Sequence, residues 1–321
     1  MDLNLYFKKC FITIPLLAIL LTGCNQNKKQ SAEINDTSEV ESDPIEYIEV
    51  TTTAMDFDIP SELQSGWTTF KYVNNSEEPH FFIFEKMPEG ITIDNYNNEL
   101  VPPFKAAFTY LLDENVEAAM KEFEKVPDWW SKVKLGGGVG LISPHRTAES
   151  TIYLNPGIYV MECYVRMPNG MPHAFFGMLK QIVVTDDIST HQEPKADFEI
   201  SVSSEKGVSF VDSLEVGNYS LAVNFEDQKL YETLLGHDIN LVKLDNLSLL
   251  DTLGKWVNAA DIKAFRSPAP VGLTFLGGVE DLEAGKTGYF NVELKEGDYV
   301  LISEVPNTIQ RNMFKTFKVY K

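Results

Sequence analysis

Apolar and polar residues alternate with two different periods along this chain, and the change of period predicts where strands and helices lie. Residues 49–53, 67–73 and 81–84 are rich in β-branched and aromatic side chains, and Asn74-Asn75-Ser76 forms a turn before the third run. Short runs of this kind, bounded by turn residues, are typical of β-strands. The chain from residue 48 on is therefore predicted to begin a β-rich domain.

Between residues 104 and 123 the apolar positions recur at helical spacing instead. Pro102-Pro103 precede this segment and Pro127 ends it. We interpret residues from about 91 to 134 as a mainly helical insertion whose aromatic face packs on the strands, with docking of a partner as the alternative. Gly136-Gly137-Gly138 lacks the Lys-Ser/Thr of a phosphate-binding loop and is predicted to be a turn that returns the chain to strands.

The second half of the chain repeats the pattern of the first. Gly137-Gly138-Val139 matches Gly277-Gly278-Val279, and Gly157-Ile158-Tyr159-Val160 matches Gly297-Asp298-Tyr299-Val300, both at an offset of 140 residues. A second helix-like stretch lies near residues 247–264. Equal offsets at two places indicate a tandem duplication. The domains predicted from this repeat are residues 47–186 and residues 196–321, with a linker at 187–195.

Residues 1–23 have the form of a bacterial signal peptide and are not predicted to belong to the fold. Lys8 and Lys9 are followed by an apolar run that is too short to span a membrane as a permanent helix. The run ends in Leu21-Thr22-Gly23-Cys24, which resembles a lipobox. The resemblance implies cleavage before Cys24 and lipidation of Cys24; an ordinary secretory signal that leaves Cys24 free is the alternative.

Residues 24–46 are polar and acidic, which predicts a disordered tether between the lipid and the fold. A lipid on Cys24 would make a membrane the first partner of this chain. The predicted location is the bacterial cell envelope, lipid-anchored to a membrane on its periplasmic or surface side.

Composition and charge narrow the class of partner. With 44% hydrophobic and 23% charged residues the chain has the composition of a globular protein. Its formal net charge of -20 argues against nucleic acid as a partner, because phosphate binding needs stripes of Lys and Arg.

Cysteine usage singles out one thiol. Of the three cysteines, Cys10 is lost with the signal peptide and Cys24 carries lipid, so Cys163 has no partner for an intramolecular disulfide. In an oxidising envelope compartment a lone thiol is expected to be buried or bound to a metal. A small buried side chain and a metal ligand both remain open on this observation alone.

Three metal-ligating side chains follow one another between two predicted strands. Cys163, His173 and Met178 lie on one loop, and Pro168-Asn169-Gly170 forces a turn in it. A thiolate and imidazoles in a plane, with a weak axial thioether, are a ligand set that suits copper.

This order of ligands resembles the cupredoxin, or blue-copper, family. In that family one more His comes from an earlier strand, and His80, which follows an Asn/Ser turn and enters an apolar strand, matches it. The resemblance implies a mainly β fold of two tandem cupredoxin-like Greek-key β-sandwiches, each with a helical insertion. It also implies one type 1-like copper ion in the first domain, with His80, Cys163 and His173 as equatorial ligands and Met178 as axial ligand.

Two details bear on the copper inference. Nine residues separate Cys163 from His173, which is close to the length of this loop in copper nitrite reductases. Phe81 stands where the family usually has an Asn. That Asn hydrogen-bonds to a hydroxyl residue after the Cys, and Tyr164 stands at this second position. A contact that normally stiffens the site is therefore missing.

The second copy tests the same inference. At the offset of 140, Cys163 falls on Ser303, and the loop that ends at Met313 contains no His. His237 corresponds to His80. The second domain is therefore predicted to lack a copper site.

These features predict a membrane-anchored copper protein that transfers electrons to a protein redox partner or handles copper. Glu162 and Tyr164 flank Cys163 where multicopper enzymes have histidines that pass electrons to a second centre, so the chain is predicted not to be an enzyme. The alternative is a metal-free binding or assembly module of the same fold, with Cys163 as a buried structural thiol. Copper delivery through the methionine-rich loop is a third possibility.

Overall fold

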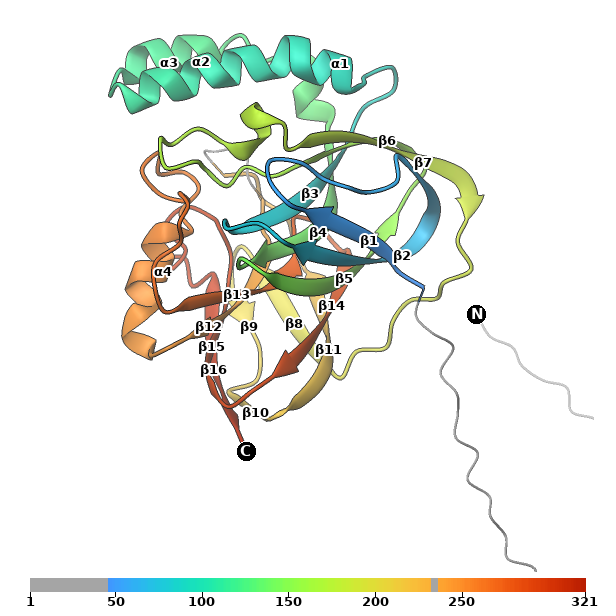
Figure 1. Ribbon diagram of the computed structural model, residues 1–321, viewed down its shortest axis with the longest axis vertical. Coiled ribbons are helices and arrows are strands. Elements are labelled where there is room, and N and C mark those ends of the chain that lie inside the picture. Colours follow the sequence, from blue (N-terminus) through green and yellow to red (C-terminus); the bar gives the residue numbers. More distant parts are fainter. Residues whose placement is uncertain (1–45, 232–235) are drawn as a thin grey trace, which may run out of the picture. The chain divides into compact units, whose positions relative to one another are not determined.

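The computed structural model describes residues 46–231 and 236–321 (Figure 1). The predicted signal peptide, the lipidation site Cys24 and almost all of the predicted tether lie outside the described residues. None of the helices in the described part has the length and apolar character that a membrane crossing needs.

Strands make up most of the regular structure, as the period of the sequence predicts. The first half contributes β1 (Ile48–Thr52), β2 (Glu62–Asn74), β3 (His80–Lys86), β4 (Lys134–Ile142), β5 (Arg146–Leu154), β6 (Gly157–Glu162) and β7 (Leu179–Ile188). The second half contributes β8 (Phe198–Ser203), β9 (Gly207–Ser209), β10 (Ser213–Glu215), β11 (Gly217–Phe225), β12 (Ile239–Leu244), β13 (Leu273–Val279), β14 (Thr287–Leu294), β15 (Gly297–Ile302) and β16 (Phe314–Tyr320). The prediction of a mainly β fold is confirmed.

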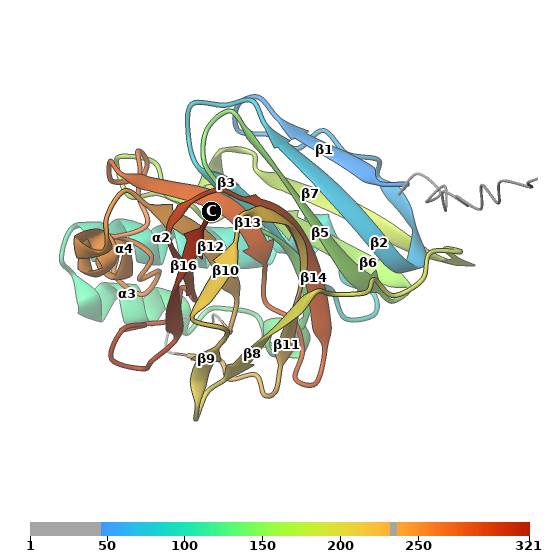
Figure 2. The same ribbon diagram turned by 90° about the horizontal axis from the view of Figure 1, so that it is seen from below.

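The strands form two layers that run through both halves of the chain. One layer has the order β1-β2-β5-β14-β11-β8-β9, and Figure 2 shows β2 and β5 continuing into β14 and β11. The other layer has the order β7-β6-β3-β4-β13-β12-β15-β16-β10. The long strand β2 pairs with β5 along most of its length and with β7 at its start, so it joins the layers. The buried apolar side chains of both halves form one continuous core between them.

The predicted insertion at 91–134 is helical. It consists of α1 (Ile93–Asn95), the π-helix η1 (Tyr96–Leu100), α2 (Val101–Leu112), α3 (Val116–Phe123) and the 3-10 helix η2 (Asp128–Lys132). In Figure 1 these helices lie beyond β6 and β7, and Tyr96 and Leu100 pack with Met87 and Val160 of the sandwich. Its apolar face therefore packs on the strands, as predicted. One detail differs: Pro102-Pro103 lie inside the first turn of α2, where the missing N–H groups cost little, and not before the helix.

The helix-like stretch predicted near 247–264 is shorter than expected. Only η4 (Leu247–Leu249) and α4 (Leu250–Trp256) are helical, and the chain after them is irregular. The ring of Trp256 packs on Phe265 and Phe275, with ring centroids 5.1 Å apart in each case. These contacts explain the apolar pattern that continues beyond the helix.

The prediction of a turn at Gly136-Gly137-Gly138 is wrong, because all three residues lie within β4. A Cβ atom on Gly138 would lie 1.9 Å from the carbonyl oxygen of Phe82 in the neighbouring strand β3. Gly278 of β13 has the same contact, at 1.9 Å, with Ile239 of β12. The glycines therefore permit a close approach of two strands, which a local reading of the sequence does not reveal.

Corresponding contacts recur in the two halves, at an offset of 140 for Val139, Asn155 and Tyr159 and of 157 for Phe82. Phe82 of β3 pairs with Val139 of β4, and Ile239 of β12 pairs with Val279 of β13. The hydroxyl of Tyr159 donates to the carbonyl oxygen of Asn155 at 2.8 Å, and that of Tyr299 donates to the carbonyl oxygen of Lys295 at 2.7 Å. The similarity of the two halves thus extends from sequence to individual hydrogen bonds.

Candidate metal centre

A buried asparagine fixes the turn that presents His80. The side chain of Asn74, at the end of β2, donates to the carbonyl oxygens of Glu78 at 2.8 Å and Ile142 at 3.2 Å. Its oxygen accepts from the backbone N–H of Ser76 at 3.0 Å. His80 follows as the first residue of β3, paired with Ile142 of β4 and fully buried. The Asn/Ser turn of the sequence thus places His80 at the rim of the sandwich core.

Backbone hydrogen bonds hold the Cys–His–Met loop closed. Cys163 directly follows β6, and His173 begins the 3-10 helix η3 (His173–Phe176). The N–H of His173 donates to the carbonyl oxygen of Val165 at 2.7 Å, and the N–H of Ala174 donates to that of Cys163 at 2.9 Å. The long gap between Cys163 and His173 is therefore a folded-back loop that returns the imidazole to the thiol.

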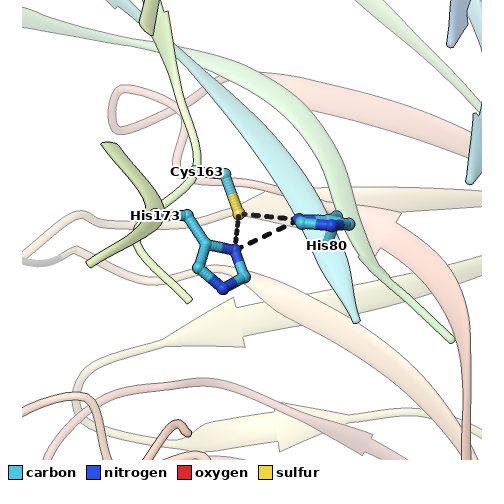
Figure 3. Close-up of side chains that lie close together, drawn as sticks. All are labelled: His80, Cys163 and His173. Carbon is cyan, nitrogen blue, oxygen red and sulfur yellow. Dashed lines mark hydrogen bonds between the residues drawn. The ribbon is translucent and has the colours of Figure 1, made fainter. Parts of the chain in front are cut away.

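The three predicted equatorial ligands converge on one point. The Sγ atom of Cys163 lies 3.7 Å from Nδ1 of His80 and 3.8 Å from Nδ1 of His173, and the two Nδ1 atoms are 3.2 Å apart (Figure 3). All three side chains are fully buried. A metal ion with bonds of about 2.0 Å to nitrogen and about 2.3 Å to sulfur, in one plane with its ligands, separates them by about 3.5–3.8 Å. The two edges to the Cys163 sulfur therefore match a bound metal ion, and the edge between the two nitrogens is about 0.3 Å shorter.

Met178 belongs to the same loop. It is fully buried, its N–H donates to the carbonyl oxygen of His173, and its carbonyl oxygen accepts from the N–H of Cys163, both at 3.3 Å. These bonds fix its backbone beside both ligands that precede it. A thiol, two imidazoles and a thioether form a donor set that fits copper. The role of Met178 as the axial ligand stays a prediction.

The outer nitrogens of the two imidazoles have different surroundings. Nε2 of His173 lies 2.9 Å from Oε2 of Glu78, although the pair does not meet the angular requirement of a hydrogen bond. Nε2 of His80 is buried and has no hydrogen-bond partner among the described residues. Within the described part of the chain, Glu78 is therefore the carboxylate that lies near enough to a ligand imidazole to orient it, and the sequence alone did not single it out.

Burial sets the protonation of the site. Desolvation lowers the pKa of His80 to about 4, and desolvation together with the charge of His80 lowers the pKa of His173 to about 3. Desolvation also raises the pKa of the Cys163 thiol far above its usual range. Both imidazoles are therefore neutral at physiological pH and offer lone pairs, whereas the thiol has to lose its proton when a metal binds.

The position after each of the first two ligands is aromatic. The rings of Phe81 and Tyr164 pack edge to face with centroids 4.5 Å apart. Phe265 from the second half packs on both rings. An apolar contact thus stands in the place of the hydrogen bond expected in the cupredoxin family, and it joins the site to the second half.

At the corresponding place in the second half, the residues that the structure describes form no set of a thiol and two imidazoles. The N–H of Ser303 donates to the carbonyl oxygen of Met313 at 3.0 Å, and the N–H of Met313 donates to that of Thr308 at 2.9 Å. This pattern matches that of Cys163, Met178 and His173, so Thr308 occupies the place of His173. The five-residue spacing to the methionine is the signal that identifies it in the sequence. His237 is engaged with the hydroxyl of Tyr231 at 3.0 Å.

Three further carboxylates, which the sequence analysis missed, lie close together in the second half: Asp238, Glu280 and Glu304. Asp238 follows His237, and Glu304 follows Ser303, at the positions that correspond to Phe81 and Tyr164. For Asp238 and Glu304, the signal in the sequence is an acidic residue at a position where the first half has an aromatic one.

Several solved structures similar to the chain are copper proteins. Auracyanin A, a "blue" copper protein from Chloroflexus aurantiacus, is 20% identical, and the match covers 43% of this chain and 98% of that protein with a TM-score of 0.26. A Cu-containing nitrite reductase from Thermus scotoductus is 12% identical over 86% of this chain and 61% of the reductase, with a TM-score of 0.21. Blue copper oxidase from Nitrosomonas europaea is 9% identical over 84% of this chain and 85% of the oxidase, with a TM-score of 0.22. No protein-family model and no curated protein matches the sequence. At such low identities and TM-scores, the case for copper rests on the geometry of His80, Cys163 and His173.

The same comparison corrects one prediction. The absence of histidines beside Cys163 predicts a protein that is not an enzyme, but a nitrite reductase and multicopper oxidases are among the similar structures. The prediction that the chain is not an enzyme is therefore wrong. Glu162 and Tyr164 remove one route of electrons to a second copper centre, and they say nothing about other chemistry at the site.

Proposed function

We propose that this chain binds one copper ion at His80, Cys163 and His173, with Met178 as the axial ligand, and that it serves electron transfer or copper handling. The observation that carries the proposal is the buried triangle formed by two Nδ1 atoms and one Sγ atom, with edges of 3.2, 3.7 and 3.8 Å. Without a metal, the two neutral imidazoles and the thiol lie within hydrogen-bond distance of one another. A single ion at the centre satisfies all three.

Copper, when bound, supplies a one-electron couple. The residues of the chain hold the ligands in one geometry and keep water away. The hydrogen bonds between Cys163, His173 and Met178 fix the loop before any metal arrives, and Asn74 fixes the turn before His80. A rigid site changes little between oxidation states, which favours rapid electron transfer.

A Cu(II) titration of the chain that starts after Cys24 tests the proposal. We expect an intense visible charge-transfer band that saturates at one equivalent, with the narrow copper hyperfine splitting of a thiolate-bound ion in EPR. Cys163→Ser should abolish the band. His145→Ala is the matched control, because His145 is exposed and its imidazole pairs with the exposed Glu77.

A second candidate function is a metal-free binding or assembly module. The apolar pair formed by Phe81 and Tyr164 and the raised pKa of the buried Cys163 thiol favour it. In that case no coloured species forms, Cys163 stays unreactive toward thiol reagents until the protein unfolds, and Cys163→Ser costs only a modest loss of stability.

The proposal extends to the arrangement of the chain. Duplication of one domain accounts for the matched hydrogen bonds of Tyr159 and Tyr299, and it makes residues 47–186 the copper domain and residues 196–321 a copy that lost its site. Lipid on Cys24 would attach both to the cell envelope, where a protein redox partner reaches the copper domain. Metabolic labelling with a radioactive fatty acid tests the anchor, and Cys24→Ser should remove the label.

A further inference from the structure

Three carboxylates of the second half meet in the interior of the molecule. They belong to Asp238, which directly precedes β12, Glu280, which follows β13, and Glu304, which follows β15. Each offers an oxygen within 4.8 Å of the others, and at most 1% of each residue is exposed. These three residues are called the carboxylate cluster below.

Hydrogen-bond donors surround two members of the cluster. Asp238 accepts from the hydroxyl of Ser303 and from the N–H of Glu304, both at 2.7 Å. The amide nitrogen of Asn240 donates to Asp238 at 2.6 Å and to Glu304 at 3.2 Å. The amide oxygen of Asn240 accepts from the N–H of Leu141 at 2.6 Å, which fixes the orientation of that amide. Tyr164 donates its hydroxyl to Glu304 at 3.0 Å.

Glu280 is different, because neither of its carboxylate oxygens has a hydrogen-bond partner among the described residues. It is fully buried and points at the other two carboxylates. No Lys or Arg of the described residues forms an ion pair with any of the three. Burying an unpaired carboxylate is costly, and burying three side by side is more so.

Either protons or a cation must balance this charge. The donors of Asn240, Ser303 and Tyr164 already face both oxygens of Asp238 and both oxygens of Glu304. A protonated carboxyl group needs an acceptor for its hydrogen, and this arrangement offers acceptors mainly within the cluster itself. Burial raises the pKa of all three carboxyl groups, and repulsion from neighbouring carboxylates, including that of Asp281, raises them further, so each gains from a positive charge placed between them.

We propose that Asp238, Glu280 and Glu304 bind one divalent cation of the hard, oxygen-preferring class, such as Mn²⁺ or Ca²⁺, at a site separate from the thiol centre. Carboxylates are the preferred ligands of these ions, and the site offers no sulfur or imidazole ligand within the cluster. The two free oxygens of Glu280 would enter the coordination shell. A cation there would also tighten the junction of the two halves, since Asn240 bonds Leu141 of β4 and Glu304 bonds Tyr164.

The wholly buried position of the cluster dictates the design of the test. The cation should enter while the chain folds, so the full chain is unfolded in chelator, freed of metal and refolded with Mn²⁺, with Ca²⁺ or with neither. After desalting, metal content is measured by mass spectrometry. We expect one equivalent of Mn²⁺ or Ca²⁺ in the wild type and less than a tenth of that in Glu280→Gln. Glu293→Gln, an exposed position on β14, is the matched control and should retain the metal.

Thermal unfolding of the wild type gives a second readout, which does not require Glu280→Gln to fold. At a hundredfold excess of cation over its Kd, the wild-type Tm should rise by about 5–10 °C, since the ion binds only the folded state. Cys163→Ser should show the same rise, because the thiol centre takes no part. An unchanged Tm with no retained metal, in protein that has refolded, would overturn the proposal and leave shared protons as the explanation of the cluster.

Discussion

The Nδ1 atoms of His80 and His173 lie 3.2 Å apart in the interior of the protein, and each faces the sulfur of Cys163. Two imidazolium ions could not share this space, because their charges would repel at short range without solvent between them. Both rings are therefore neutral, in agreement with pKa values lowered to about 4 and about 3. The one ligand that still carries a displaceable proton is the thiol.

The first prediction concerns protons released on copper binding. Between pH 5 and pH 8 we expect about one proton per copper ion, because the thiol must ionise while the imidazoles are already neutral. Raising the pH removes the proton that competes with copper for the thiol, so the logarithm of the copper affinity rises by about one for each pH unit. Ordinary histidines, with a pKa of about 6.5, would steepen the slope below pH 6.5.

Calorimetry in buffers of different ionisation enthalpy measures the number of protons, and competition with a chelator measures the affinity at each pH. Cys163→Ser is the control for the thiol and should reduce the release to near zero at pH 8. A release of two or three protons at pH 5.5 would contradict the assignment of neutral imidazoles.

The second prediction concerns Glu78, whose Oε2 lies 2.9 Å from Nε2 of His173. A carboxylate behind a ligating imidazole orients the ring and raises its basicity, and loss of such a partner weakens metal binding by about 10–100-fold. Glu78→Gln should therefore lower copper affinity by that factor and leave the fold intact. Glu77→Gln is the matched control, because Glu77 is the neighbouring exposed residue and contacts His145. Equal affinities for the two variants would mean that Glu78 does not position the ligand.

The third prediction concerns the turn that presents His80. Asn74 is fully buried and its side chain bonds to Glu78, Ile142 and Ser76. Asn74→Ala leaves buried carbonyl oxygens and an N–H without partners, which should cost about 2–3 kcal/mol of unfolding free energy and broaden the copper spectrum. Asn75→Ala, at an exposed position in the same turn, should change neither by a measurable amount. Chemical denaturation followed by fluorescence provides the free energies.

The sequence predicts the β-fold and the thiol centre well because both leave local signals. Strand periods identify the layers, and the order of His80, Cys163 and His173 in the chain identifies side chains that the structure brings to one place. The turn predicted at Gly136-Gly137-Gly138 is wrong because these glycines are needed for a contact between strands, the close approach of Gly138 to Phe82. Composition around a glycine cannot reveal which backbone lies opposite.

The carboxylate cluster escaped prediction for a related reason. Asp238, Glu280 and Glu304 are far apart in the chain, and each looks like an ordinary solvated charge in its own surroundings. Only the pairing of β12 with both β13 and β15 brings them together. A comparison of the two halves position by position offers the one sequence signal, since carboxylates replace the aromatic rings of Phe81 and Tyr164.

The fourth prediction concerns Arg166, which joins the loop of the thiol centre to the second half. Its guanidinium is buried and donates to the carbonyl oxygens of Ala264, at 2.9 Å, Asp261 and Ala259. Arg166→Met keeps much of the apolar volume but leaves these three carbonyl oxygens without their donor, so we expect a loss of about 3–4 kcal/mol. Arg166→Lys should recover only part of this loss, because an ammonium group cannot reach three acceptors in the geometry of the planar fork.

Both variants should also affect the thiol centre, because Arg166 lies three residues after Cys163 and its N–H bonds to Phe265. We expect the visible copper band to shift in proportion to the loss of stability, more in Arg166→Met than in Arg166→Lys. Such a shift would establish that contacts with the second half hold the loop in shape. Arg146→Met, at an exposed position on β5, is the matched control. If Arg166→Met is as stable as the control, these three hydrogen bonds contribute no net stability, and the packing of Phe81, Tyr164 and Phe265 must hold the two halves together here.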